Sequence, residues 1–128
     1  MGLTTDDTIN ILQLYSRYNT AIDTGDSSSF GACFVSDGIF DNGMNVIEGQ
    51  TGIAEFAAQT HSAMPGLRHN AVNIVVDGDG MIATGSAFLI GYLIDGGYNV
   101  IVTGRYTDEL TKTSGGWRFT RRAFKADN

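Results

Sequence analysis

The chain has 128 residues, a length that suits one domain with one hydrophobic core, and we expect a single domain over residues 1–128. Apolar residues make up 42% of the sequence and charged residues 17%, so the chain can bury a core and should not be disordered. The formal net charge of -6 would repel phosphate backbones, which argues against nucleic acid as a partner.

Other classes of protein are disfavoured by what the sequence lacks. No apolar run approaches the length that spans a membrane, and the polar start is unlike a signal peptide. The single cysteine, Cys33, has no internal disulfide partner. Two histidines without a carboxylate at ligand spacing form no metal motif, and the glycines do not follow the dinucleotide-binding pattern. We therefore expect a cytoplasmic protein without a metal, a cofactor or a membrane association.

The first predicted helix starts with hydroxyl and carboxylate side chains. Thr4 or Thr5, followed by Asp6 and Asp7, can satisfy the free amide groups at the positive end of a helix. Gly25 then provides the residue at which a left-handed cap is easiest to form. Three- and four-residue steps between these ends predict a buried stripe of Ile9, Leu12, Tyr15, Asn19 and Ile22.

Two more helices and a series of strands follow. A short helix starts at Asp26 and carries Phe30, Cys33 and Phe34, and a third helix spans residues 51–62. Turn residues separate the predicted strands, which are 39–41, 45–48, 67–76, 81–94, 98–110 and 117–124. Three helices before a long antiparallel meander predict an α+β fold, with the helices packed on one face of a strongly curved, mostly antiparallel sheet. Glycines within the long strands permit the bends that would wrap this sheet around an apolar pocket.

Asp23 is the most informative residue of the first helix. It lies about three helical turns after Leu12 and so returns to the same side, with Asn19 one turn before it. A carboxylate that points into a core is costly unless it has a partner. Asp23 is therefore either a cap for the helix end or a member of a buried polar site.

His69 opens a predicted strand, and alternation places it on one face with Ala71 and Asn73. A histidine at the edge of a strand is often structural, and we expect only that role for His61. Together with Asp23, however, His69 has a possible chemical role. An aspartate that accepts the Nδ1 proton of a histidine sets its tautomer, stabilises the imidazolium and makes the other nitrogen a better base.

Several segments resemble one protein family. Residues 14–26, Arg68-His69 with Asn73, and residues 104–109 and 116–119 resemble the first helix, the histidine strand and the last two strands of SnoaL-like members of the NTF2-like superfamily. Within that superfamily the sequence is similar to the branch of scytalone dehydratase, the bacterial bile-acid 7α-dehydratase and hexachlorocyclohexane dehydrochlorinase. The resemblance covers nearly the whole chain and implies a cone-shaped α+β barrel, in agreement with the predicted elements.

The resemblance also implies site residues. Asp23 and His69 match the helix aspartate and strand histidine that form the catalytic pair of that branch. Tyr18 and Asn19, on the helix that carries the aspartate, are further candidates for contacts with substrate. Gly91 stands near the position of scytalone dehydratase's second histidine, so that second base is missing. The residues that the resemblance places in the pocket are Ala87, Leu89, Val102, Gly104 and Arg122.

Two functional hypotheses follow. The first is a cofactor-independent lyase that dehydrates or β-eliminates a small hydrophobic, cyclic molecule, with ketosteroid-isomerase-like and polyketide-cyclase-like reactions as alternatives. The second is a non-catalytic module that binds a small molecule or assembles with another subunit. Under both hypotheses the outer sheet face with Phe88, Ile90 and Tyr92 needs a cover, which predicts a homo-oligomer. The resemblance favours a trimer, although other family members form dimers.

Overall fold

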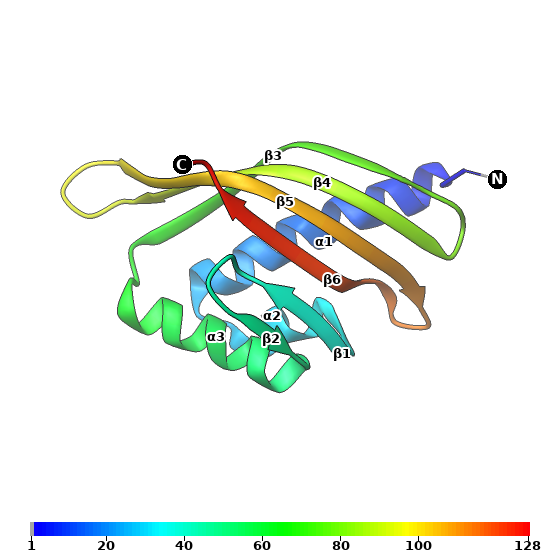
Figure 1. The fold of residues 1–128 in the computed structure, drawn as a ribbon, viewed down its shortest axis with the longest axis horizontal. Coiled ribbons are helices and arrows are strands. Elements are labelled where there is room, and N and C mark those ends of the chain that lie inside the picture. The colour runs from blue at the N-terminus through cyan, green and yellow to red at the C-terminus, as the bar shows by residue number, and fades with distance from the viewer. Residues whose placement is uncertain (1) are drawn as a thin grey trace.

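The computed structural model describes residues 2–128 and places three helices on one side of a six-stranded sheet (Figure 1). The expected α+β fold is confirmed. Within the described residues, none of the helices is long and apolar enough to cross a membrane. In chain order the elements are α1 (Thr5–Thr24), α2 (Ser27–Ala32), β1 (Phe34–Asp41), β2 (Val46–Glu48), α3 (Gln50–Ala63), β3 (Leu67–Gly78), β4 (Ile82–Leu93), β5 (Asn99–Thr113) and β6 (Gly116–Ala126).

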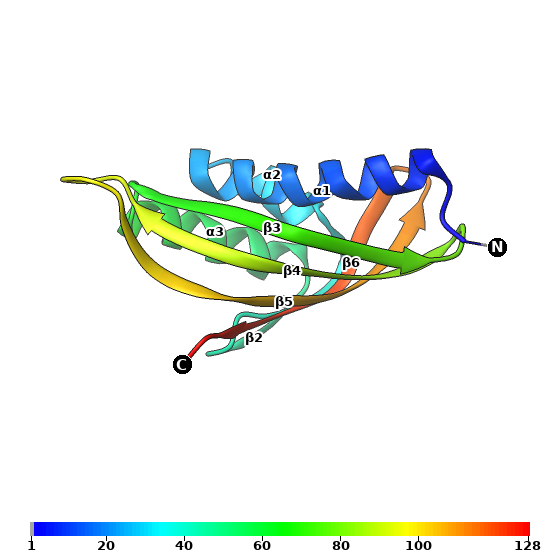
Figure 2. The ribbon, with the colours of Figure 1, turned by 90° about the horizontal axis from the view of Figure 1, so that it is seen from above.

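The sheet has the strand order β2-β1-β6-β5-β4-β3. Neighbouring strands are antiparallel except β1 and β6, which are parallel. Seen from above, the long strands curve away from α1, and all three helices lie on the same side of them (Figure 2). This arrangement places α1 beside the edge strand β3, across the inner face of β4, β5 and β6.

Helix α1 begins and ends where the sequence predicts. Thr4 is the N-cap, and its side chain accepts a hydrogen bond from the backbone of Asp7 at 3.0 Å while the Asp7 carboxylate accepts one from the backbone of Thr4. Gly25 closes the other end with φ of 79°, the left-handed conformation that glycine adopts at little cost.

The buried face of α1 differs from the predicted stripe. Ile9 is 50% exposed and Leu12 is 37% exposed, so both predictions are wrong. The buried side is instead centred on Ile11 and Tyr18. A helix advances about 100° per residue, so Leu12 and Asp23 lie together at the margin of this face and not at its centre. Asp23 therefore sits where the helix meets solvent and strand β3.

Two strands also differ from their predicted form. β1 begins at Phe34, which was expected to lie in the second helix, because Phe34 pairs with Phe119 of β6 in a contact distant in sequence. In β3 the alternation breaks after Ala71, since the register shifts between Val72 and Val75. Asn73 has a positive φ of 54° and is exposed, so it does not share a buried face with His69.

The core lies between the helices and the inner face of the sheet. On β4 and β5 the buried positions alternate with exposed ones, as expected for a sheet with one covered face. Aromatic rings fill the middle of this layer, where Tyr18 packs within 6.3 Å, between ring centroids, of Phe30, Phe34 and Phe119. The inner side of the cone is consequently packed with side chains around Tyr18.

Candidate functional site

Asp23 projects from the last full turn of α1 toward the edge strand β3. Its side chain is 14% exposed, so most of the carboxylate is removed from water. A carboxylate in that position requires hydrogen-bond donors or a nearby positive charge. The hydrogen-bond donors are provided by one residue of β3, His69, which follows Arg68 near the start of that strand.

His69 and Asp23 meet through two contacts. Nδ1 of the imidazole lies 2.6 Å from Oδ1 of the carboxylate. The backbone N–H of His69 donates to the other oxygen, Oδ2, at 2.9 Å. The carboxylate therefore contacts both the ring and the main chain of the histidine. These contacts explain the position of the Asp23 side chain without a role as a helix cap. Because Nδ1 is the nitrogen that faces the carboxylate, this contact favours the neutral tautomer in which Nδ1 carries the proton and Nε2 has the lone pair.

A pocket of about 210 Å³ lies in the seam between α1 and β3. His69 and Ala71 line it from the strand, and Tyr15 and Asn19 line it from the helix. The His69 side chain is 12% exposed, and within residues 2–128 its Nε2 makes no hydrogen bond. The free nitrogen thus belongs to a residue that borders solvent-accessible space.

Asn19 contributes an unpaired polar atom beside the same pocket. The residue is 8% exposed, and its Oδ1 is buried without a hydrogen-bond partner in residues 2–128. A buried amide oxygen without a donor costs free energy, which a ligand or a water molecule with a suitable donor would recover. The contact with substrate that the sequence suggests for Asn19 stays a prediction.

A second acid–base pair lies deeper in the cone. Arg122 of β6 and Asp108 of β5 occupy directly opposed positions in the sheet, and both side chains are 0% exposed. Nε of the guanidinium lies 3.0 Å from Oδ1 of the carboxylate, although the N–H does not point at the oxygen well enough to form a hydrogen bond. The hydroxyl of Tyr15 donates to the second carboxylate oxygen, Oδ2.

Burial and charge act in opposite directions on this pair. Burial raises the pKa of Asp108, while the Arg122 charge and the Tyr15 hydroxyl lower it. Burial lowers the pKa of Arg122, but the Asp108 charge together with Tyr18, Tyr106 and Tyr15 raises it above its usual value overall. The pKa of Asp108 is raised overall, whereas the guanidinium keeps its proton across the accessible pH range, so Asp108 faces a permanent positive charge.

Aromatic rings enclose the Arg122 guanidinium. Its central carbon, Cζ, lies 3.5 Å from the ring centroid of Tyr106 and 4.3 Å from that of Tyr18. The rings of Tyr15 and Phe119 lie at 4.9 Å and 4.7 Å. Negative ring faces stabilise a desolvated cation, which compensates for the hydrogen bonds that the three guanidinium nitrogens lack in the described residues. Burial also raises the pKa of Tyr18, so its phenol stays protonated.

The residues predicted to line a central pocket are mostly part of the packed core. Ala87 and Leu89 are 2% and 4% exposed, and both belong to the hydrophobic core together with Tyr18. Gly104 is buried and Val102 is half-buried against the same core. These residues therefore do not converge on the pocket beside His69. His69 and Asn19 line that pocket, and Asp23 contacts His69 without lining it. Arg122 lies apart from them in its aromatic enclosure.

Three residues around Arg122 are not among the predicted site residues. Tyr15, Tyr106 and Asp108 complete the enclosure of Arg122. A signal for Asp108 was present, because it stands between Tyr106 and Leu110 at the alternate positions of a strand that face the core. An inward aspartate opposite an arginine on the neighbouring strand indicates a buried ion pair. Within residues 2–128, no cluster of three His, Cys, Asp or Glu side chains is suited to a metal ion.

Comparison with known proteins places this geometry in a family. A family model described as a SnoaL-like domain matches residues 4–123. No curated protein matches the sequence. Among solved structures, a protein of unknown function from Mycobacterium tuberculosis is 31% identical with a TM-score of 0.88, and the match covers 94% of this chain and 72% of that one.

Two structures from Novosphingobium aromaticivorans are also similar. One, proposed to be an aromatic ring hydroxylase, is 30% identical with a TM-score of 0.84 over 97% of this chain and 91% of that chain. The other is an NTF2-like protein with a cystatin-like fold, 26% identical with a TM-score of 0.87 over 93% of this chain and 80% of that chain. Since the family model matches residues 4–123 of the 128, the chain belongs to the SnoaL-like domain family.

Proposed function

We propose that the protein is a cofactor-independent, lyase-like enzyme in which His69 is the general base and Asp23 orients it. The observation that carries the proposal is the double contact of the Asp23 carboxylate, at 2.6 Å to Nδ1 and 2.9 Å to the backbone N–H of His69. This geometry holds the imidazole in one tautomer and leaves Nε2 as the only ring nitrogen that can accept a proton.

The proposed step is a β-elimination. Nε2 of His69 takes a proton from a carbon of the substrate, and the electron pair of the broken C–H bond forms a carbon–carbon double bond. The leaving group on the adjacent carbon departs with its own electron pair, as hydroxide in a dehydration or as halide. The imidazolium then returns its proton to the leaving group or to water. Asp23 stabilises the positive charge that His69 carries between these events.

The pocket limits the kind of substrate. Its volume of about 210 Å³ is below the range of about 300–1,000 Å³ that is usual for drug-sized ligands. We therefore propose that a small hydrophobic molecule places one ring of its skeleton in the seam. The unpaired Oδ1 of Asn19 would accept a hydrogen bond from a hydroxyl of that molecule.

In this proposal Arg122 and Tyr18 do not contact the substrate directly. Both are buried, and the guanidinium is enclosed by aromatic rings. The contribution of Arg122 is electrostatic: a guanidinium fixed in a dry core keeps the same field when negative charge develops on the substrate. The branch of scytalone dehydratase and hexachlorocyclohexane dehydrochlorinase is the part of the family whose chemistry this arrangement fits.

Isomerisation and cyclisation use the same first step. A base that removes a proton next to a carbonyl forms an enolate, which is then protonated elsewhere or attacks a second carbonyl. Elimination differs because a group is lost. The reaction products therefore distinguish a dehydratase from a ketosteroid-isomerase-like or polyketide-cyclase-like enzyme.

The test is a substrate screen in D₂O followed by proton NMR. Hydroxy-ketones, hydroxylated aromatics, halogenated cyclohexanes and steroid enones are incubated with wild type, His69→Ala and Asp23→Asn. Loss of water or halide reports elimination, and deuterium incorporation at an acidic carbon reports proton removal without elimination. The matched control is His61→Ala, which removes the only other histidine of the chain.

We expect turnover with at least one class, and a loss of about 10²–10⁴-fold in His69→Ala, the usual contribution of a general base. Asp23→Asn should lose activity as well, while His61→Ala should keep it. The proposal fails if no class reacts or exchanges, or if folded His69→Ala turns over as fast as wild type.

A second candidate is a non-catalytic module that binds a ligand or another subunit. The packed core around Tyr18 favours it, because little space is open in the middle of the cone. The outer face also exposes apolar side chains, with Phe88 at 44% and Ile90 at 36%. Self-association through this face, as a trimer or a dimer, is compatible with either candidate. Sedimentation of wild type and Phe88→Ser measures it, and a monomeric wild type would contradict it.

A further inference from the structure

The pocket beside His69 has a floor and a rim that differ in their access to water. Tyr15 and Asn19 are 1% and 8% exposed and form the floor. The other lining residues are the half-buried His69, Ala71 and Ile74 and the exposed Ser16, Thr20 and Asn70. A molecule that enters between α1 and β3 therefore meets Tyr15 or Asn19 at the greatest depth.

Tyr15 extends from this floor to the buried ion pair. Its hydroxyl donates to Oδ2 of Asp108, and Cζ of Arg122 lies 4.9 Å from the centroid of its ring. Both members of the pair are 0% exposed, and neither lines the pocket. The Tyr15 side chain thus separates the pocket from the pair.

The Tyr15 ring is held in place from several sides. Its hydroxyl is bonded to Asp108, and Phe119 meets the ring in an edge-on arrangement with the centroids 5.4 Å apart. The hydroxyl also fills the space that a side chain at Gly85 would need. A ring packed in this way cannot move aside for a larger ligand without disturbing the core.

The position of Tyr15 on α1 separates it from the proposed chemistry. Tyr15, Asn19 and Asp23 follow one another at four-residue steps, so Tyr15 lies about two turns before the aspartate that contacts His69. It therefore meets a part of the bound molecule away from the reacting carbon. Contacts with such remote parts determine which substrates are used well.

We infer that Tyr15 is a specificity-determining residue, which limits the seam to molecules with a single hydroxylated ring. This inference rests on the proposed function and names the substrate class of the same site. The pocket is small, at about 210 Å³, and its floor is fixed, so a second fused ring has no room. A smaller side chain at position 15 extends the pocket toward Asp108 and Arg122.

The test compares the binding of phenol and 2-naphthol, which differ by one fused ring, to ¹⁵N-labelled wild type, Tyr15→Phe and Tyr15→Leu. The readout is the ratio of the two dissociation constants on each protein, because a general loss of stability affects both ligands alike. We expect wild type and Tyr15→Phe, which keeps the ring, to favour phenol. Tyr15→Leu should shift the ratio toward 2-naphthol by about tenfold or more, the lower end of what a change in the size of an apolar pocket contributes.

Phe30→Leu is the matched control for the loss of a core ring. Phe30 is 0% exposed and packs on Tyr18 with ring centroids 4.4 Å apart, but it does not line the pocket. This variant should keep the wild-type ratio. An equal shift in Phe30→Leu and Tyr15→Leu would show that loosening of the core, and not the floor of the pocket, sets the preference.

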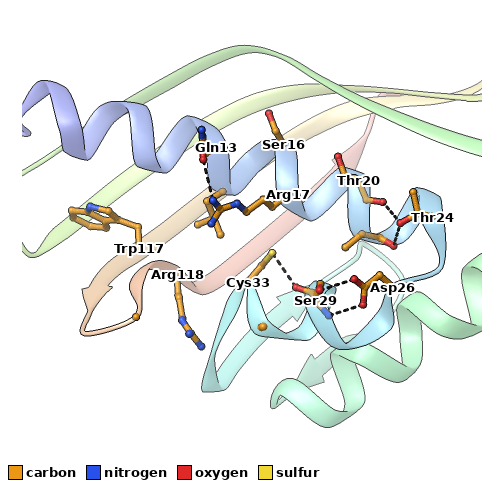
Figure 3. A pocket seen from close by; sticks show the side chains of 14 residues that line it. Gln13, Ser16, Arg17, Thr20, Thr24, Asp26, Ser29, Cys33, Trp117 and Arg118 are labelled. Carbon is orange, nitrogen blue, oxygen red and sulfur yellow. Dashed lines mark hydrogen bonds between the residues drawn. The ribbon is translucent and has the colours of Figure 1, made fainter.

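A map of amide shifts in wild type locates bound phenol without any substitution, and so it decides even if Tyr15→Leu does not fold. A separate groove of about 650 Å³ lies on a different flank of α1, where Trp117 and Cys33 border it (Figure 3). Phenol in the seam should shift the amides of Tyr15 and Ala71. The indole N–H of Trp117, the only tryptophan, should not move.

Three results overturn the inference. They are shifts that gather around Trp117, a folded Tyr15→Leu with the wild-type ratio, and a Tyr15→Phe that shifts the ratio as much as Tyr15→Leu. Failure of the proposed function has a different signature, because the predicted binding ratios would then be found without turnover of any substrate.

Discussion

The two acid–base pairs of the cone differ mainly in their access to water. Asp23 and His69 are 14% and 12% exposed and are joined by two hydrogen bonds. Asp108 and Arg122 are both 0% exposed, and the guanidinium meets the carboxylate at 3.0 Å without hydrogen-bond geometry. The outer pair includes an imidazole that borders solvent, whereas the guanidinium of the inner pair lies in the core and keeps its proton.

This difference assigns different tasks to the pairs. A histidine that borders solvent can exchange protons with a substrate and with water, as a general base must. An ion pair sealed among aromatic rings cannot exchange protons readily, but it maintains a constant field and depends on both partners for its stability. We therefore expect substitutions of the inner pair to affect folding, and substitutions of the outer pair to affect chemistry.

The largest expected effect is that of Arg122→Met. The substitution keeps an apolar side chain of similar length but leaves the Asp108 carboxylate buried without its cation. Removing one partner of a buried pair typically costs about 3–5 kcal/mol in the free energy of unfolding. Urea unfolding measures the change, with Arg121→Met as the control, because its exposed pair with Asp41 should contribute less than about 1 kcal/mol. Equal effects of the two substitutions would contradict a structural role for the inner pair.

A smaller loss in the free energy of unfolding is expected for Gly85→Ala. A methyl group at Gly85 would collide with the hydroxyl of Tyr15, which is held in place by its hydrogen bond to Asp108. Such overpacking costs about 1–3 kcal/mol. Gly80→Ala is a matched control, since a methyl group there meets no atom within 4 Å. Thermal unfolding of the two variants measures the difference. If both melt at the wild-type temperature, the Tyr15 hydroxyl does not lie as close to Gly85 as the structure indicates.

His69→Gln should change stability still less. The variant removes the imidazole but retains the backbone hydrogen bond to Asp23, so we expect a loss of about 1 kcal/mol, the usual net contribution of one hydrogen bond. Chemical denaturation quantifies it beside Arg122→Met. If the two substitutions were equally costly, the outer pair would be a structural element and the catalytic proposal would lose its main support.

The smallest change in stability is expected at acid pH and concerns Asp7, near the N-terminal end of α1. Hydrogen bonds from Lys112 at 3.0 Å and Trp117 at 3.1 Å lower the pKa of Asp7 below its ordinary value of 3.8. Folding therefore favours the ionised form of Asp7. Its contribution to the free energy of unfolding is complete above pH 3.8 and is lost as the pH falls through the lower pKa that Asp7 has in the folded state.

The urea midpoints of wild type and Asp7→Asn, compared from pH 2 to pH 6, measure this contribution. We expect the gap between them to be constant in the upper part of the range and to narrow as the solution becomes more acidic. The exposed neighbour Asp6 offers a control, Asp6→Asn, for the removal of an acid from the same helical turn. A gap that widens toward acid pH would reverse the sign of the argument.

Much of the local structure was predictable from short-range physics. The cap at Thr4, the left-handed Gly25 and the alternation of the long strands depend on residues close in sequence. Tyr15, Asn19 and Ile22 of the predicted α1 stripe are buried, but Ile9 and Leu12 are apolar yet exposed. An apolar side chain at a surface breaks no physical rule, so composition alone does not show which side of a helix is covered.

The sequence by itself thus determined the α+β class, most element ends and Asp23 and His69 as the residues to examine. Only the tertiary structure decided that they touch, because they are 46 positions apart and no local pattern relates the end of α1 to the start of β3. It also decided that Arg122 is enclosed by rings from α1, β5 and β6, and that the predicted pocket residues pack as core. Such contacts depend on how helices dock on the curved sheet, and side chains distant in sequence jointly set that docking.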